Sequence, residues 1–277
     1  MSVGQLRDNA ITSLFGRPKI VIGVIHSRAL PGAPRYRGGP VAEIYDYALA
    51  EAQRYAEAGV DGLIVENHGD IPFLKPDAIG PETAACMAVM TERVRVATGL
   101  QIGVNVLANG ALQALSIAQA AGASFIRVNQ WSNAYVANEG IVEGPAAIAL
   151  RYRRTIGAEA VRIFADVHVK HGAHAITADR SIEELARDNE FFDADVAIAT
   201  GQRTGNAATP EELATIAGAT SLPVVVGSGV SEGNVERIMS TASGVIVASS
   251  LKKDGVWWNP VDPARARSFM RVVKGLR

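Results

Sequence analysis

Short apolar runs rich in β-branched residues alternate along the chain with longer segments of helical periodicity. The first run, residues 19–25, is continuous enough to be buried on both faces of a sheet. A strand-then-helix unit of this kind occurs eight times, at spacings of roughly 20–40 residues. The predicted strands are 19–25, 60–65, 100–106, 125–129, 161–169, 195–199, 224–226 and 245–247. The predicted helices are 41–58, 81–97, 111–121, 145–156, 181–189, 210–217, 231–240 and one that begins near 263.

Eight such units predict an α/β protein with the (β/α)8 TIM-barrel fold. An open doubly wound sheet is the alternative, and a glycine-rich fingerprint after the first strand would favour it. In this chain the first strand is followed by His26-Ser27-Arg28, and the glycine-rich turn comes late. We therefore expect residues 1–277 to form a single barrel domain. Residues 1–18 are a cap segment, with a short helix over 6–15 that covers the amino-terminal mouth.

Composition excludes several classes of function. The net charge of −1 leaves no basic surface for nucleic acid. The single cysteine, Cys86, cannot form an internal disulfide, which fits a reducing compartment. No segment approaches the roughly 18 uninterrupted apolar residues of a membrane span, and no signal-peptide layout is present at the start of the sequence. We expect a cytoplasmic homo-oligomer, and peripheral attachment to a membrane stays open.

The last two predicted strands both end in small residues. Gly227-Ser228-Gly229 follows one strand, and Ala248-Ser249-Ser250 follows the next. Small residues let backbone N–H groups approach an anion, and barrels commonly hold phosphate in the loops after their last two strands. The predicted phosphate-binding residues are Gly227, Ser228, Gly229, Ser249 and Ser250. For either loop alone, a plain tight turn is the alternative.

Polar residues at the carboxyl ends of barrel strands point into one mouth. The densest group follows the fifth strand, where Asp166, His168 and Lys170 share one face because a strand has a period of two. Together with Glu66 they are the candidate catalytic residues, since neighbouring titratable groups shift one another's pKa and can transfer protons. The alternative is structural: a buried Asp–Lys pair with a hydrogen-bonded histidine, and Glu66 paired with Arg127.

Further strand-end residues are candidate ligands of a substrate. Arg127 suits bidentate binding of an anion, and the asparagines suit hydroxyl or carboxylate groups. The full set is His26, Asn67, Asn105, Arg127, Asn129, Thr200 and Gly201. A hydrogen-bonded histidine at the edge of the core is the alternative for His26, and a plain turn is the alternative for the loop that begins at Thr200.

Histidine spacing raises the question of a metal. His168, His171 and His174 recur every three residues, which suits a helix, but His168 ends a predicted strand. Glu66, Asp166 and His168 could converge on a divalent cation. Because no compact metal motif is present, we do not favour a metal and leave the cofactor unassigned. His171 and His174 are interpreted as polar loop residues.

These motifs together resemble the BtpA/SgcQ family. The resemblance rests on Ile22-Gly23-Val24-Ile25-His26 with Leu30-Pro31-Gly32 and Pro34, Asp61-Gly62-Leu63-Ile64-Val65-Glu66-Asn67, Arg127-Val128-Asn129, Ala165-Asp166-Val167-His168-Val169-Lys170-His171, and Thr200-Gly201 with Thr204-Gly205. It spans nearly the whole chain and implies a single barrel of the ribulose-phosphate-binding type. It supplies neither a reaction nor catalytic residues.

Two functions follow from the sequence. The first is an enzyme acting on a phosphorylated sugar or nucleoside-like molecule by acid/base chemistry, as an isomerase, an aldol-type lyase or a glycosidic-bond-cleaving enzyme. The second is implied by the resemblance, because the family takes its name from a cyanobacterial factor needed for photosystem I accumulation. It is a non-catalytic assembly or stability factor for a membrane complex such as photosystem I. The intact polar set favours the enzyme, because a site without function should have drifted to apolar filling.

Overall fold

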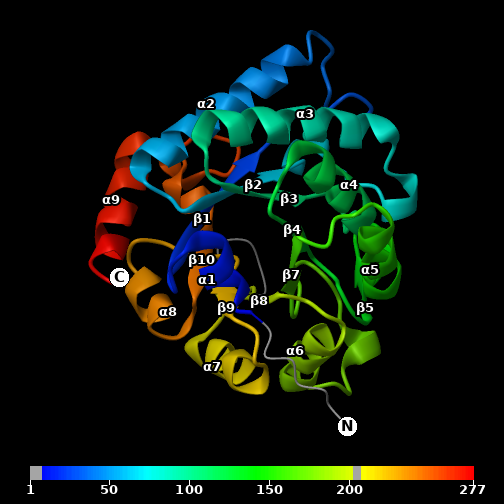
Figure 1. The fold of residues 1–277 in the computed structure, drawn as a ribbon, viewed down its shortest axis with the longest axis vertical. Coiled ribbons are helices and arrows are strands. Elements are labelled where there is room, and N and C mark those ends of the chain that lie inside the picture. The colour runs from blue at the N-terminus through cyan, green and yellow to red at the C-terminus, as the bar shows by residue number, and fades with distance from the viewer. Residues whose placement is uncertain (1–7, 202–206) are drawn as a thin grey trace.

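The computed structural model of the protein, which describes residues 8–201 and 207–277, is a closed barrel of parallel strands surrounded by helices (Figure 1). The strand order around the barrel is β1-β10-β9-β8-β7-β4-β3-β2. This arrangement confirms the predicted (β/α)8 fold. The beginning of the predicted cap segment and the Thr204-Gly205 motif lie outside the described residues.

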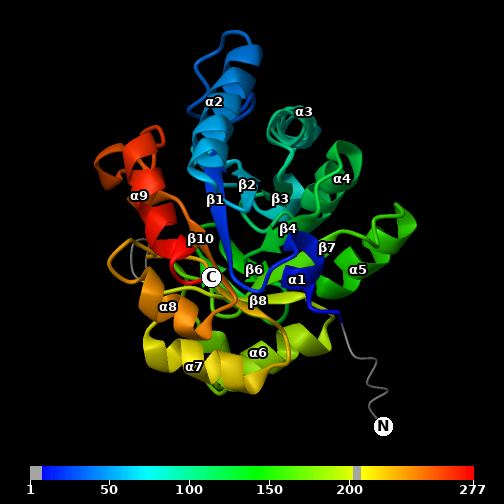
Figure 2. The ribbon, with the colours of Figure 1, turned by 60° about the vertical axis from the view of Figure 1, so that its left-hand side comes forward.

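The elements agree closely with the predicted pattern. The barrel strands are β1 (Ile20–His26), β2 (Gly62–Glu66), β3 (Gln101–Asn105), β4 (Phe125–Val128), β7 (Arg162–Asp166), β8 (Val196–Ala199), β9 (Val224–Val226) and β10 (Gly244–Val247). The outer helices are α2 (Ala42–Ala58), α3 (Pro81–Thr98), α4 (Ala111–Ala121), α5 (Ala146–Thr155), α6 (Ile182–Phe191), α7 (Pro210–Ala219), α8 (Val235–Thr241) and α9 (Pro263–Lys274) (Figure 2). Within the described ranges, no helix is both long and apolar enough to cross a bilayer.

Three predicted boundaries were wrong by several residues. The cap helix begins at Ala10, after its N-cap Asn9, and not at residue 6. β7 ends at Asp166 and not at residue 169, because side chains take the next carbonyls out of the strand pairing. Asn189 Nδ2 donates to Asp166 O, and Thr200 Oγ1 donates to His168 O. α8 begins at Val235 and not at residue 231. Asn234 explains the later start, since its side chain accepts a hydrogen bond from Ser231 N and donates one to Gly229 O, which holds the preceding residues in a turn.

Apolar side chains from alternate strand positions fill the interior of the barrel. The cluster contains Ile20, Ile22, Val24, Ile64, Phe125, Phe164, Val196, Ile198, Val225 and Ile246. Phe125 and Phe164 stack with ring centroids 4.3 Å apart. Gly103 makes room for this pair, since a Cβ there would lie 2.2 Å from the Phe125 ring.

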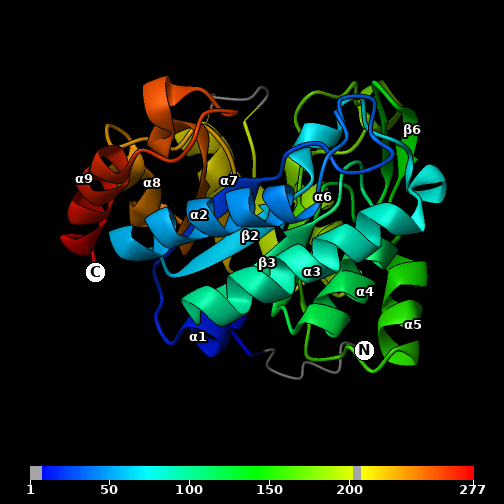
Figure 3. The ribbon, with the colours of Figure 1, turned by 90° about the horizontal axis from the view of Figure 1, so that it is seen from above.

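A short helix, α1 (Ala10–Phe15), packs on one end of this interior cluster. The Asn9 side chain caps it by accepting hydrogen bonds from Ile11 N and Thr12 N. Ile11 is fully buried, and Phe15 meets Phe125 edge-on at 6.1 Å. The helix lies on the opposite side of the molecule from the loops that carry the polar residues (Figure 3).

The loop after β4 contains an antiparallel hairpin that the sequence analysis did not predict. It consists of β5 (Ala134–Ala137) and β6 (Gly140–Glu143), joined by a turn in which Gly140 has a φ of 101°. Val136 forms a bridge to Ala173, which ties the hairpin to the loop after β7. The hairpin therefore lies with the loops on the carboxyl-terminal side of the barrel (Figure 3).

Candidate active site

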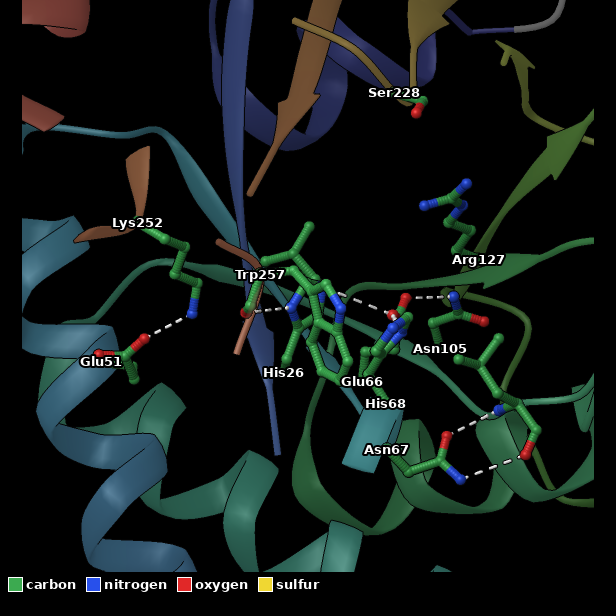
Figure 4. Close-up of polar contacts among 12 residues, drawn as sticks. His26, Glu51, Glu66, Asn67, His68, Asn105, Arg127, Ser228, Lys252 and Trp257 are labelled. Atoms are coloured by element: carbon green, nitrogen blue, oxygen red, sulfur yellow. Dashed lines mark hydrogen bonds and ion pairs between the residues drawn. The ribbon is translucent and has the colours of Figure 1, made fainter. Parts of the chain in front are cut away.

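A row of polar side chains crosses three neighbouring strands at their carboxyl ends. His26 is the register partner of Glu66, and Glu66 is the register partner of Asn105. In β1 the inward positions are Ile22 and Val24 before His26, so the two-residue period brings the histidine to the same face as the apolar filling. All three polar side chains are buried. The apolar interior therefore gives way to polar groups at the mouth. Figure 4 shows these polar side chains.

The Glu66 carboxylate contacts the other two side chains of this row and also His68. Its Oε1 accepts a hydrogen bond from His68 Nδ1 at 3.0 Å and lies 3.7 Å from His26 Nε2. Its Oε2 accepts a hydrogen bond from Asn105 Nδ2 at 2.6 Å. Burial alone would raise the pKa of Glu66, but the hydrogen bond and charge of His68, with the charges of His26 and Arg127, lower this pKa well below its usual range. Glu66 is therefore ionised at neutral pH.

His26 is held by the loop that follows β10. Its Nδ1 lies 3.2 Å from the carbonyl oxygen of Trp257, and its ring stacks on that of His68 with centroids 4.6 Å apart. The Trp257 ring meets His68 edge-on at 4.3 Å. Burial lowers the pKa of His26 to about 3, although the charge of Glu66 opposes the shift. The neutral ring then donates its Nδ1–H to Trp257 and keeps a lone pair on Nε2.

Arg127 and Asp166 form a buried bidentate ion pair. Arg127 Nε and Nη2 lie 3.0 Å from the two carboxylate oxygens of Asp166, and Asn129 Nδ2 donates to Asp166 Oδ2 at 3.1 Å. Burial would lower the pKa of Arg127, but the Asp166 carboxylate and, less strongly, Glu66 raise it. Arg127 is therefore paired with Asp166, and not with Glu66 as the structural alternative proposed.

Two buried amide oxygens stand beside this pair. Asn105 Oδ1 and Asn129 Oδ1 accept no hydrogen bond from any residue in the described ranges. One side chain ends β3, and the other directly follows β4, the neighbouring strand. Buried acceptors normally have a donor, so these oxygens are suited to receive hydrogen bonds from a ligand or from water.

Lys170 connects this region with the first small-residue loop. Its Nζ donates a hydrogen bond to Ser228 Oγ at 3.3 Å, and Ser228 is buried. Burial, followed by repulsion from Arg127, lowers the pKa of Lys170 to about 8, against the opposing charges of Asp166 and Glu66. Gly229 has a φ of 67°, which a glycine adopts without strain.

The two small-residue loops leave neighbouring strands, because β9 pairs with β10. Ser249 and Ser250 begin a short 3₁₀ helix, η4 (Ser249–Leu251), and Ser250 Oγ donates to Val230 O at 2.6 Å, which joins this loop to the one after β9. All five predicted phosphate-binding residues therefore follow adjacent strands. Their binding of phosphate stays a prediction.

The remaining predicted residues mainly connect loops. Asn67 Oδ1 accepts from Leu107 N at 2.7 Å, so this side chain joins the loops after β2 and β3. Thr200 Oγ1 donates to the His168 carbonyl at 2.7 Å, and Gly201 is buried next to it. The His168 ring lies against that of His174, tilted by 31° with centroids 3.8 Å apart, and lines a cavity of about 470 Å³ together with Arg180 and Glu212. The structure thus brings together Asp166 with Arg127 and Lys170 with Ser228, and turns His168 toward His174.

Two residues of the mouth were not included in the predicted site. His68 lies in the short 3₁₀ helix η1 (His68–Asp70), and Trp257 lies in the loop after β10. A signal for His68 was present, since it comes two residues after Glu66 and a histidine also ends the preceding strand. Trp257 gave no such signal, because its contact with His26 joins segments 231 residues apart.

Fold and site define the class of protein: a (β/α)8 barrel whose mouth is lined by a carboxylate–histidine cluster, a buried Arg–Asp pair and two loops of small residues. The BtpA family model matches residues 17–275. The chain therefore belongs to the BtpA family, as the sequence motifs indicated.

Relatives of similar length occur in distant organisms. An uncharacterized protein of Archaeoglobus fulgidus is 40% identical over 257 residues, which cover 93% of this chain and 99% of that protein. The photosystem I biogenesis protein BtpA of Synechocystis is 39% identical over 260 residues, which cover 93% of this chain and 89% of that protein.

Solved structures of low sequence identity share the fold. Thiamine phosphate pyrophosphorylase from Pyrococcus furiosus has a TM-score of 0.57 at 15% identity, covering 97% of this chain and 99% of that one. N-(5'-phosphoribosyl)anthranilate isomerase from the same organism has a TM-score of 0.56 at 15% identity, covering 93% and 99%. Orotidine 5'-phosphate decarboxylase from Pyrococcus horikoshii has a TM-score of 0.56 at 13% identity, covering 92% and 99%.

Proposed function

We propose that this protein is an enzyme that binds a phosphorylated sugar or nucleoside-like molecule in the barrel mouth and transfers a proton on it. The observation that carries the proposal is the contact between Lys170 Nζ and Ser228 Oγ at 3.3 Å. It places a lysine of lowered pKa between the small-residue loop after β9 and the charged interior of the mouth.

The location of the small-residue loops supports a phosphorylated ligand. They leave β9 and β10, which are the last two barrel strands and pair with each other. The names of the three solved structures above each contain a phosphorylated compound. Backbone N–H groups around Gly227, Ser228 and Gly229 would hold the phosphate, with Lys170 as its counter-charge.

The charges and hydrogen bonds in the mouth suggest which residues position the substrate and which transfer the proton. Both carboxylate oxygens of Asp166 accept hydrogen bonds from Arg127 or Asn129, so Asp166 positions the arginine. Lys170 has a pKa of about 8, close to neutral pH, and such a group is well matched to give and take a proton. Asn105 Oδ1 and Asn129 Oδ1 would accept hydrogen bonds from ligand hydroxyls. Isomerase, aldol-type lyase and glycosidic-bond cleavage all fit this arrangement.

Thermal shift with paired ligands tests the proposal. Ribose 5-phosphate and AMP are expected to raise the melting temperature, whereas ribose and adenosine leave it unchanged. Ser228→Asp places a negative charge at the proposed phosphate position and is expected to abolish the shift. Ser240→Asp, at an exposed serine of α8, is the matched control and keeps it. A full panel of sugar phosphates and nucleotides without any shift, or a Ser228→Asp variant that binds like the wild type, would overturn the proposal.

The name of one relative supports a second candidate function. The Synechocystis protein, 39% identical, is named for photosystem I biogenesis, so a non-catalytic assembly or stability factor is the alternative. Replacement of Lys170 and His168 together, by Met and Ala, separates the two functions in cells that depend on this protein. A normal phenotype at normal protein levels supports the assembly factor, and a phenotype like that of the deletion supports the enzyme.

A further inference from the structure

We propose that His26, Glu66 and His68 form a binding site for one divalent transition-metal ion such as Zn²⁺. Each residue offers one donor atom, and all three atoms lie within 4.8 Å of one another. Two imidazole nitrogens and one carboxylate oxygen are a donor set of zinc sites that keep an open position. This inference goes beyond the proposed function and does not depend on it.

The separations between donor atoms fit a common metal ion. His68 Nδ1 is 3.0 Å and His26 Nε2 is 3.7 Å from Glu66 Oε1. Tetrahedral ligands at zinc distances of about 2.1 Å lie about 3.4 Å from one another. The donor atoms are therefore near their bound spacing already, and the metal would replace the proton that His68 shares with Glu66.

The residues behind two of the donors have the arrangement that metal ligands require. His26 Nδ1 faces the carbonyl oxygen of Trp257 at 3.2 Å, which directs the lone pair of Nε2 toward Glu66. Asn105 Nδ2 holds Glu66 Oε2 at 2.6 Å, which leaves Oε1 for the histidines. Such hydrogen bonds orient ligands in metalloproteins and fix the tautomer of the histidine.

The cluster is enclosed, but one ligand is accessible. His26 and Glu66 are buried, whereas the His68 side chain is 27% exposed. The Trp257 ring lies against His68 at 4.3 Å, and Phe73 meets His68 at 5.8 Å, so aromatic groups limit the contact with water. A metal ion would therefore enter beside His68, the partly exposed ligand, next to the Trp257 ring.

The structure differs from the metal ligands considered from sequence. Glu66 stays in the donor set, but Asp166 is bound by Arg127 and Asn129, and the His168 ring lies against His174. Register explains the change, because the neighbouring strands β1 and β2 align His26 directly with Glu66.

Metal titration of the full chain tests the proposal. After chelation and dialysis into phosphate-free buffer, calorimetric titration with Zn²⁺ is expected to give one equivalent bound. Co²⁺ in place of Zn²⁺ is expected to give the visible absorption of a four- or five-coordinate nitrogen–oxygen site. Glu66→Gln and His68→Ala are each expected to weaken Zn²⁺ binding by more than about 100-fold, since even outer-shell changes cost 10–100-fold.

His174→Ala is the matched control, because this half-buried histidine lies against His168 outside the cluster, and the variant should bind Zn²⁺ like the wild type. His68 is partly exposed, so its variant should fold, and circular dichroism checks this. The proposal is overturned if the wild type binds no Zn²⁺, or if Glu66→Gln and His68→Ala bind Zn²⁺ like the wild type. Because the experiment measures metal binding alone, its outcome does not depend on whether the protein binds phosphorylated ligands.

Discussion

Lys252 and Glu51 form an ion pair in which both side chains are completely buried, with Nζ 2.6 Å from Oε2 (Figure 4). Lys252 directly follows η4, and Glu51 lies in α2, so the pair attaches the segment after β10 to the helix after β1. Glu51 also accepts hydrogen bonds from the Val261 backbone N–H at 3.0 and 3.1 Å. Segment 252–261 is therefore fixed at both ends, and Trp257 lies between them.

Replacement of Lys252 by Met is expected to destabilise the protein by about 1–3 kcal/mol, because it removes the fully buried counter-charge of Glu51. The carboxylate then keeps only Arg54, whose Nη1 lies 2.6 Å from Oε1 and whose side chain is 36% exposed. Urea unfolding followed by circular dichroism measures the change. Arg154→Met is the control: this arginine is 83% exposed, its partner Glu159 is 48% exposed, and the loss should stay below about 1 kcal/mol. Equal losses in the two variants would show that the buried Glu51–Lys252 pair stabilises the protein no more than an exposed ion pair.

The fold could be predicted because its pattern is local. Runs such as 19–25 are apolar throughout, as strands buried on both faces must be, and helix ends carry their own signals. Thr209 caps α7 by accepting a hydrogen bond from Glu212 N, and Gly122 ends α4 with a φ of 71°. Such features depend on a few neighbouring residues, so they can be recognised in the sequence alone.

The candidate site could be predicted only as a set of positions. The strand ends of β1, β2 and β3 bring His26, Glu66 and Asn105 together, but His168 lies against His174. The partners of the other residues depend on contacts between distant segments. Asp166 pairs with Arg127 and not with Lys170, since β4 and β7 are neighbours in the barrel. The hairpin β5–β6 was missed because each of its strands has only one buried residue, Tyr135 or Val142, so it lacks the continuous apolar run that marks the barrel strands.

Gly103→Ala is expected to destabilise the protein by about 1–3 kcal/mol, because the new Cβ would lie 2.2 Å from the Phe125 ring and would force the stacked aromatic pair to move. Gly218→Ala provides the matched control in α7, where nothing lies within 4 Å of the added Cβ. There, loss of a helical glycine should stabilise the protein by up to about 1 kcal/mol. Thermal and urea unfolding measure both, and a Gly103→Ala variant as stable as the wild type would contradict the packing argument.

The Arg127–Asp166 pair is expected to show strong coupling. Asp166→Asn or Arg127→Met alone leaves one buried charge without its partner and should cost about 3–5 kcal/mol. The double variant removes both charges and should be clearly more stable than the sum of the single losses predicts. A double-mutant cycle by urea unfolding gives the coupling free energy. Strictly additive effects would mean that the two side chains contribute independently despite their bidentate contact.

Lys170 is expected to make the free energy of unfolding of the unliganded protein depend on pH. Because burial and repulsion from Arg127 lower the pKa of Lys170 to about 8, the unfolded chain binds more protons than the folded one between that value and the ordinary value of 10.5. The contribution of Lys170 to the free energy of unfolding therefore rises with pH across this window. Urea unfolding of the wild type and of Lys170→Met at pH 7.5, 8.5 and 9.5 measures this contribution as the difference between the two proteins. A difference between the two proteins that stays constant with pH would contradict the lowered pKa.

Loss of the Lys170 proton is expected to lower the affinity for a phosphorylated ligand, so affinity falls as the pH rises. Below about pH 8 Lys170 is charged and attracts an anion next to Ser228, and above this pH it becomes neutral. The affinity of the wild type for ribose 5-phosphate should therefore fall as the pH rises from 7 to 9.5, by about tenfold if the lysine charge contributes about 1.4 kcal/mol. Lys170→Arg stays charged over this range, so its affinity should be nearly independent of pH. Lys170→Met should bind weakly at every pH. If wild type and Lys170→Arg lose affinity in parallel, the titrating group is not Lys170, and the lysine has no part in holding the phosphate.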